Sequence, residues 1–217
     1  SQLKQTTQMI HCLMKRSILL PALLGFSCAA SAAPQTFDFA DPKGVNNATF
    51  TLDAPLETIT GSATGISGTI TIDRENPAET KGKIVIDATS LHVPNPVMKE
   101  HLHSADWMDS ETHGTITFEL KGLEDVKVDG DKAHATVLGT FTMKGVTKEV
   151  SVPVQATLLP GKLADRSNGQ MQGDLLVLRS DFTLKRSDFG INPGAPTDKV
   201  ADEVQIRLAI AGASPKE

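Results

Sequence analysis

The chain of 217 residues carries 21 basic and 26 acidic side chains, which gives a formal net charge of −5 at pH 7. This excess of acid argues against a nucleic-acid partner, because phosphate backbones bind basic surfaces. The two cysteines, Cys12 and Cys28, both lie near the N-terminus, so the rest of the chain can form no disulfide and has no thiol chemistry.

The N-terminal region has the pattern of a secretory leader. Lys15 and Arg16 precede an apolar run at residues 18–30, and the run leads into an Ala-Ser-Ala tripeptide. A charged start, an apolar stretch of about a dozen residues and an A-x-A site are together typical of a signal peptide. We therefore predict a signal peptide over residues 14–32, cleaved after Ala32, and export to the periplasm.

The same region supports further expectations. Residues 1–13 precede Met14 and match nothing in such a leader, so we predict that they are an upstream segment. Lipidation of Cys28 is the less favoured alternative, because a lipoprotein signal usually has a branched aliphatic residue where Gly25 stands. The apolar run is shorter than the ~20 residues that span a bilayer, so no stable membrane span is predicted. Cleavage would leave residues 33–217 as a single domain with 18 basic and 26 acidic side chains, a net charge of −8.

Apolar and polar residues alternate along most of the chain after residue 36. Such alternation gives a strand one apolar face and one wetter face. The segments that show it are 70–72, 84–86, 116–120, 137–143, 150–158, 182–184 and 204–210. About eight strands of this kind, separated by turn residues, predict an all-β sandwich or barrel.

The residues between these segments indicate consecutive hairpins. An Asp-Gly pair at 129–130 is a strong hairpin signal, because both residues tolerate positive φ, and a Lys-Gly pair at 144–145 separates the next two strands in the same way. Residues 159–168 are predicted to form a long polar hairpin loop. Because proline cannot donate a backbone hydrogen bond to a neighbouring strand, Pro153 is predicted to lie at an edge position or a bulge of its strand. Consecutive hairpins favour an antiparallel meander over a parallel sheet.

One segment departs from the strand pattern. Residues 96–109 place Met98, Leu102 and Ala105 at helical spacing, and the Asn-Pro pair at 95–96 supplies a good N-cap followed by a good first helical residue. We predict one short helix between strands, lying near a mouth of the barrel.

The segment also holds the most metal-like cluster of the chain. His101 and His103 lie close in sequence to Asp106, Asp109 and His113. Two residues that are two positions apart on a helix point in nearly opposite directions, so no metal site is predicted. The chain has no nucleophile elbow, paired-cysteine motif or phosphate-binding glycine loop. We therefore predict that it is not an enzyme and needs no cofactor.

Three stretches carry a likeness to a known family. They include Gly-Thr-Ile-Thr-Ile-Asp at 68–73, His-Leu-His-Ser-Ala-Asp-Trp-Met-Asp at 101–109 and Arg-Ser-Asp-Phe-Gly-Ile at 186–191. With this order and spacing, the chain resembles the YceI-like family of bacterial periplasmic proteins that bind polyisoprenoids and related lipids. The departures, at residues 93–95 and Met108 among others, fall in loops and at the predicted barrel mouth. They therefore bear on which lipid is bound more than on the fold.

The resemblance implies a lipocalin-like, closed antiparallel β-barrel of about eight strands that holds a long lipid, such as a polyisoprenoid or a quinone. Plain core packing is the alternative for each residue that could line the bore. The candidate lining residues are Ile116, Phe118, Leu120, Phe141, Met143, Val152 and Phe189. Arg186 and Asp188 are candidates for binding a polar head group, and a strand-end salt bridge is the favoured alternative for them. A homodimer is left open.

Two functions fit these features. The first is a periplasmic carrier of a long apolar lipid held inside the barrel. The alternative is a barrel with a filled core that acts through its surface, as an envelope interaction or stress-response module without a ligand. An enzyme that acts on an apolar substrate inside the barrel is the least favoured reading.

Overall fold

The structure, a computed structural model, describes residues 33–216, so the predictions for residues 1–32 lie outside the described residues. Within this range the strands form one antiparallel sheet in the order β1-β4-β5-β6-β7-β8-β9-β10-β2-β3, and β1 also pairs with β10. The strands are β1 (Gln35–Asp38), β2 (Asn47–Asp53), β3 (Thr58–Ala63), β4 (Ile66–Ile72), β5 (Lys81–Asp87), β6 (Thr115–Asp129), β7 (Lys132–Met143), β8 (Val146–Leu159), β9 (Gly173–Lys185) and β10 (Glu203–Pro215).

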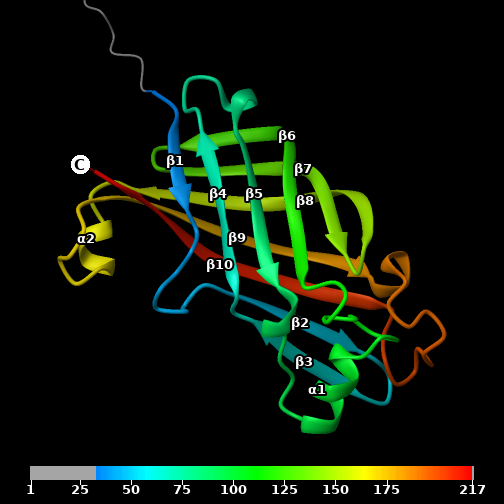
Figure 1. Cartoon of the computed structure of the whole chain (residues 1–217). Coiled ribbons are helices and arrows are strands. Elements are labelled where there is room, and N and C mark those ends of the chain that lie inside the picture. Colours follow the sequence, from blue (N-terminus) through cyan, green and yellow to red (C-terminus); the bar gives the residue numbers. More distant parts are fainter. Residues whose placement is uncertain (1–32, 217) are drawn as a thin grey trace, which may run out of the picture. The chain divides into compact units, whose positions relative to one another are not determined.

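The sheet closes into a barrel because β1 pairs with both β4 and β10 (Figure 1). In the chain, the pair β2–β3 lies between β1 and β4, and both β1 and β2 pair with β10. Strands β1 and β2 therefore act as one interrupted strand, and β3 and β4 act as another. The ten strands therefore occupy eight positions around the barrel. The prediction of an all-β, closed antiparallel barrel of about eight strands is confirmed.

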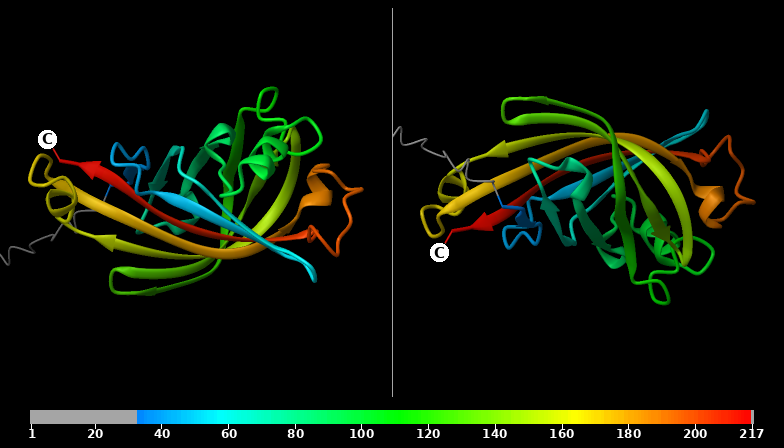
Figure 2. Two further views of the ribbon diagram at one scale, coloured as in Figure 1. Left: turned by 90° about the horizontal axis from the view of Figure 1, so that it is seen from below. Right: turned by 90° about the horizontal axis from the view of Figure 1, so that it is seen from above.

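The connections gather at the two ends of the barrel. We call one the hairpin end; it carries the connections at 73–80, 130–131 and 160–172. We call the other the helix end; it carries the connections at 54–57, 88–114, 144–145 and 186–202. The helix α2 (Leu163–Arg166) belongs to the hairpin end and α1 (Pro96–His103) to the helix end, and Figures 1 and 2 show them far apart. Three 3₁₀ helices complete the connections: η1 (Pro77–Glu79), η2 (Ala88–Ser90) and η3 (Arg186–Phe189).

Both predicted hairpin turns are present. Lys144 and Gly145 have φ values of 49° and 72°, as a type I′ turn requires. In the β6–β7 turn, Asp129 pairs with Lys132, so Gly130 takes the first central position with a φ of 60°. Glycine at that position is typical of a type II′ turn, so the turn lies one residue later than the Asp-Gly pair suggested.

The prediction for Pro153 is also confirmed. The ladder between β8 and β9 starts only at the pair Gln155–Arg179, so Pro153 lies in a part of β8 that pairs with β7 alone. The predicted loop at 159–168 is less irregular than expected, because it contains α2. Leu163 at the start of α2 is buried, and a single apolar residue in a polar segment gave too little pattern to reveal the helix.

Helix α1 begins where the sequence predicted. The Asn95 side chain accepts hydrogen bonds from the backbone N–H groups of Val97 and Met98, at 3.0 and 3.1 Å. The helix ends at His103, well before residue 109, because Ser104 adopts an extended conformation. No helix within residues 33–216 has the length and apolar character that crossing a membrane demands.

The carboxylate of Asp174 ties the hairpin end together. One oxygen accepts hydrogen bonds from the backbone N–H of Gly161 at 2.8 Å and from the Lys216 ammonium at 3.0 Å, and the other accepts one from the Gln35 amide at 3.0 Å. The Gly161 N–H lowers the pKa of this carboxyl against the opposing effect of burial, and Gln35 and Lys216 lower it further. Asp174 therefore joins the starts of β1 and β9 to the end of β10.

We expect Asp174→Asn to lower the free energy of unfolding at neutral pH by about 1–3 kcal/mol, since it weakens charged hydrogen bonds. A carboxyl whose folded-state pKa lies below its unfolded value stabilises the protein above the unfolded pKa, and this contribution is lost as the pH falls through the folded-state pKa. The difference between wild type and variant should therefore shrink below about pH 4. Urea unfolding at neutral and acidic pH measures it, and a difference that does not change with pH would contradict the assignment.

Candidate functional site

The barrel encloses a cavity of about 610 Å³. Strands β2 to β10 all contribute lining residues, and the lining includes positions at both ends of the barrel. The side chains come from the inward phase of each strand, as alternation requires. For example, Ile84, Phe118 and Phe141 are cross-strand neighbours on β5, β6 and β7, and all three line the cavity.

The interior of the cavity offers no unpaired polar group. Ser180 and Arg186 are the buried polar side chains in its lining, and both are hydrogen-bonded. The Ser180 hydroxyl donates to the carbonyl oxygen of Pro153 at 2.6 Å. Within residues 33–216, no buried side-chain nitrogen or oxygen lacks a partner. A polar guest would lose its hydrogen bonds to water in this bore without replacement, so the cavity favours an apolar one.

The structure places six of the seven predicted lining residues on the cavity. These are Ile116, Phe118, Leu120, Phe141, Met143 and Val152. Phe189 does not line it: this residue lies in η3 and packs edge-on against Phe141, with the ring centroids 5.7 Å apart. Strand β9 ends at Lys185, so Phe189 follows the strand rather than continuing its inward face. That these side chains contact a lipid stays a prediction.

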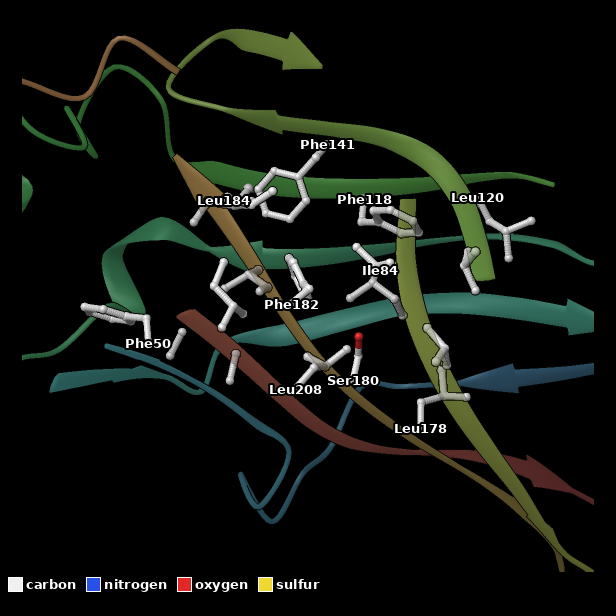
Figure 3. A pocket seen from close by; sticks show the side chains of 18 of the residues that line it. Phe50, Ile84, Phe118, Leu120, Phe141, Leu178, Ser180, Phe182, Leu184 and Leu208 are labelled. Atoms are coloured by element: carbon white, nitrogen blue, oxygen red, sulfur yellow. The ribbon is translucent and has the colours of Figure 1, made fainter. Parts of the chain in front are cut away.

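Side-chain size changes along the bore. Figure 3 shows Phe50, Phe141 and Phe182 toward one side of the cavity and Leu120 and Leu178 toward the other. The Phe141 and Phe182 rings meet edge to face, with centroids 6.4 Å apart. Aromatic side chains therefore gather toward the helix end of the bore.

The lining at the hairpin end is smaller. The inward positions of β7 and β8 near this end include three alanines, Ala133, Ala135 and Ala156, beside Val154 and Leu158, and all of them line the cavity. Three lining residues toward the helix end, Phe50, Trp107 and Phe182, were not predicted from the sequence. The alternation in residues 182–184 already contained the signal for Phe182, whereas β2, which carries Phe50, was not predicted as a strand.

Arg186 has a structural role. It is 2% exposed, and its guanidinium donates hydrogen bonds to five backbone carbonyls. The acceptors are the carbonyl oxygens of Ile191, Asn192, Ala195, Val200 and Ala201. An arginine side chain has five N–H groups, so none is left over for a ligand.

The other head-group candidate, Asp188, does not line the cavity, and the structure shows no salt bridge between it and Arg186 among residues 33–216. The carboxylate of Asp202 instead accepts hydrogen bonds from the Ser187 N–H at 3.0 Å and the Ser187 hydroxyl at 2.7 Å. These contacts favour a structural role for the motif over lipid head-group binding.

The Arg186 network organises the helix end. The guanidinium lies over the Trp107 ring, 5.8 Å from its centroid, which is a cation–π distance. The Asn192 N–H donates to the Asp106 carbonyl at 3.0 Å, and Lys144 donates to the same carbonyl at 3.1 Å. The connection at 186–202 is thus fixed to the segment that follows α1.

One histidine of α1, His103, is engaged within the protein. The two ring nitrogens of His103 contact the Ser110 hydroxyl and the Leu91 carbonyl oxygen, both at 2.9 Å. In the part of the chain that the structure describes, no three His, Cys, Asp or Glu side chains gather as metal ligands would.

Comparison with known proteins gives consistent matches. A family profile described as "YceI-like domain" matches residues 40–211. A UPF0312 protein of Pseudomonas paraeruginosa is 30% identical over 152 residues, which cover 70% of this chain and 72% of that protein. Protein YceI of Escherichia coli O157:H7 is 28% identical over 156 residues, which cover 72% of this chain and 74% of that protein.

Solved structures share the fold. BcnA of Burkholderia cenocepacia has a TM-score of 0.61 at 23% identity and covers 76% of this chain and 95% of its own. A polyisoprenoid binding domain from Saccharophagus degradans, implicated in plant cell wall breakdown, has a TM-score of 0.61 at 13% identity and covers 84% of this chain and 100% of its own. At such identities the likeness concerns the fold.

We expect Arg186→Ala to lower the free energy of unfolding by about 3–5 kcal/mol, because it leaves buried carbonyl groups without donors. Arg179 offers a matched control: it begins the same Arg-Ser-Asp-Phe sequence, but its side chain is exposed on β9. Arg179→Ala should cost less than about 0.5 kcal/mol. Denaturant unfolding of both variants makes the comparison, and similar losses would show that the Arg186 network is not stabilising.

Proposed function

The chain belongs to the YceI-like family, and from this premise we propose that it binds a long apolar lipid, of the polyisoprenoid or quinone type, inside its barrel and carries it through an aqueous compartment. The observation that carries the proposal is the apolar cavity, whose buried polar groups, Ser180 and Arg186, are already paired within the protein. The solved relative named as a polyisoprenoid binding domain supports the same ligand class.

The free energy of burying apolar groups favours a ligand with a long tail. Removing a methylene group from water is worth about 0.8 kcal/mol, so a prenyl chain gains affinity along its whole length when it lies in an apolar bore. An eight-stranded barrel is just wide enough to hold one small or elongated ligand. A tail enclosed in this way could leave a membrane without exposing its methylene groups to water.

The filled-core interaction module remains the alternative function, and the cavity weighs against it. Empty space inside a protein is destabilising, by roughly 24 cal/mol per Å³ in one well-studied series of core substitutions. A barrel that worked only through its surface would gain stability by filling the bore. A void lined by apolar side chains is more readily explained by a guest that occupies it.

A binding role is also favoured over catalysis. Burial alone would raise the pKa values of Asp41 and Asp202, but hydrogen bonds from neighbouring N–H and hydroxyl groups together lower them, and neither residue lines the cavity. The hydroxyl of Ser180, which does line the cavity, is engaged by the Pro153 carbonyl. We therefore propose that the bound lipid is carried unchanged.

The proposal includes export of the protein from the cytoplasm. The leader pattern at residues 14–32 supports transfer to the periplasm, where a soluble lipid carrier would act between membranes. N-terminal sequencing of the protein from a periplasmic fraction should find Ala33 as its first residue. Recovery of the protein in the cytoplasm with residues 14–32 attached would contradict export.

The ligand itself is directly testable. Protein purified from a bacterial periplasm should release about one prenyl lipid per chain on organic extraction, identified by mass spectrometry. Protein without bound lipid should gain thermal stability when a prenyl lipid is added, because a ligand that binds only the folded state stabilises it. A lipid-free protein whose melting temperature does not respond would favour the interaction module.

A substitution that fills the bore should weaken lipid binding. Ala156 on β8 points into the cavity between Ala133 and Leu178, so Ala156→Phe would occupy space that several methylene groups need. We expect at least about tenfold weaker binding, since each displaced methylene is worth about 0.8 kcal/mol. The adjacent Thr157 is on the opposite face of the strand, so Thr157→Phe is the control. Equal affinities for the two variants, measured by lipid titration, would place the ligand elsewhere.

A further inference from the structure

We propose that the lipid enters the barrel at the hairpin end and keeps an anionic, phosphate-bearing head group there, beside Arg74 and Lys132, with its tail pointing toward Trp107. The inference rests on the proposed function and deepens it, because it assigns a direction to the ligand and a charge to its head. Three features of the structure support it. Strand β6 has an edge without a partner strand, and two cations that form no salt bridge among the described residues lie beside this edge. The helix end of the bore is lined by aromatic side chains.

The open edge belongs to β6. Its ladder with β5 ends at the pair Lys83–Glu119, although β6 continues to Asp129 and stays paired with β7. Residues 120–129 therefore have a free edge on the β5 side. The inner-face residues Val126 and Val128 line the cavity and are 38% and 66% exposed. The bore thus reaches solvent between the β6–β7 hairpin and the connection at 73–80.

This edge is not suited to pairing with another strand. The register shifts between Glu124 and Lys127, where Asp125 has a φ of 51°, so the strand carries a bulge. Lys121 also lies on this stretch and is exposed. Bulges and charged side chains are the features that protect strand edges from strand addition. The gap is therefore better explained as a passage into the bore than as a docking site for a strand.

Cations flank the passage. Arg74 in the 73–80 connection and Lys132 at the start of β7 both belong to the cavity lining. Both are exposed, and neither forms a salt bridge among the described residues. Asp73 and Asp131 also line the cavity at this mouth. The carboxylate of Asp73 accepts hydrogen bonds from two backbone N–H groups, both at 2.9 Å, so it is partly engaged. Arginine and lysine are the side chains that bind phosphate oxygens.

The helix end lacks such free donors. The guanidinium of Arg186 donates all five of its N–H groups to backbone carbonyl oxygens. The charged or titratable side chains that line the cavity near this end are otherwise Glu57 and His101. Phe50, Phe182 and Trp107 present apolar surface instead. An apolar chain end fits this end of the bore, whereas a phosphate there would meet no arginine or lysine of the lining with a free N–H group.

The head-group assignment can be tested with two probes that share one tail, solanesyl phosphate and solanesol. Lipid-free protein should bind the phosphate about 5- to 10-fold more tightly than the alcohol, and added salt should reduce the difference, as expected for two exposed ion pairs. The double variant Arg74→Ala/Lys132→Ala should bind the phosphate no more tightly than the alcohol. Its affinity for solanesol should equal that of wild type.

Lys148 provides the control. It is an exposed lysine on β8 near the helix end and outside the cavity lining, so Lys148→Ala should keep the preference for the phosphate. If wild type binds both probes equally tightly and the double variant changes neither, the head-group assignment is overturned while the carrier function stands. If neither probe binds, the carrier function fails as well.

The direction of the tail can be tested by fluorescence, because Trp107 is the only tryptophan of the chain. A nitroxide at the tail end of solanesyl phosphate should quench Trp107 more strongly than a nitroxide attached next to the phosphate. In Trp107→Phe/Val128→Trp, the reporter sits at the hairpin end, and the order of quenching should reverse. The opposite order in both proteins would place the head group at the helix end and overturn the proposal.

Discussion

An antiparallel sheet that closes on itself must direct half of its side chains into one bore, and the rest of this structure depends on that constraint. Closure runs through the interrupted strand formed by β1 and β2, which pairs with β10 on one side and with β4 and β3 on the other. Once the ring is closed, eight strand positions set the width of the bore. What the inward side chains then leave unfilled is the cavity.

The two ends of the barrel differ in how their connections are held and in whether they are open to solvent. At the helix end, a buried cation holds the connection at 186–202 through five carbonyl groups and stacks on Trp107. Such a network is favourable only when every partner is paired, and here every N–H group of Arg186 has an acceptor. At the hairpin end, β6 extends past β5 and leaves an edge open. A hydrogen-bonded helix end and an open hairpin end together suit a site that takes up one long molecule.

Much of the candidate site was predictable, because alternation identifies the inward face of each strand. Ile116, Phe118 and Leu120 were found in this way, since they share one phase of β6. Phe189 does not line the bore, because it lies in η3 beyond the end of β9. The phase of β9 could have excluded it, since Phe189 lies at odd offsets from the inward residues Phe182 and Leu184. The two Arg-Ser-Asp-Phe sequences make the same point: Arg179 is exposed on a strand, whereas Arg186 is buried at a connection.

The sequence by itself determined the strand faces, the glycine-containing hairpin turns, the Asn95 cap of α1 and the family, because each depends on neighbouring residues or on motif order. Only the tertiary structure decided that the bore is hollow, where it opens and which cations stand at its mouth. Alternation states which side chains point inward, but the space between them depends on how strands distant in sequence are staggered around the ring. Arg74 and Lys132 are 58 positions apart, and the arrangement of β4 to β7 in the sheet brings both to the hairpin end of the barrel.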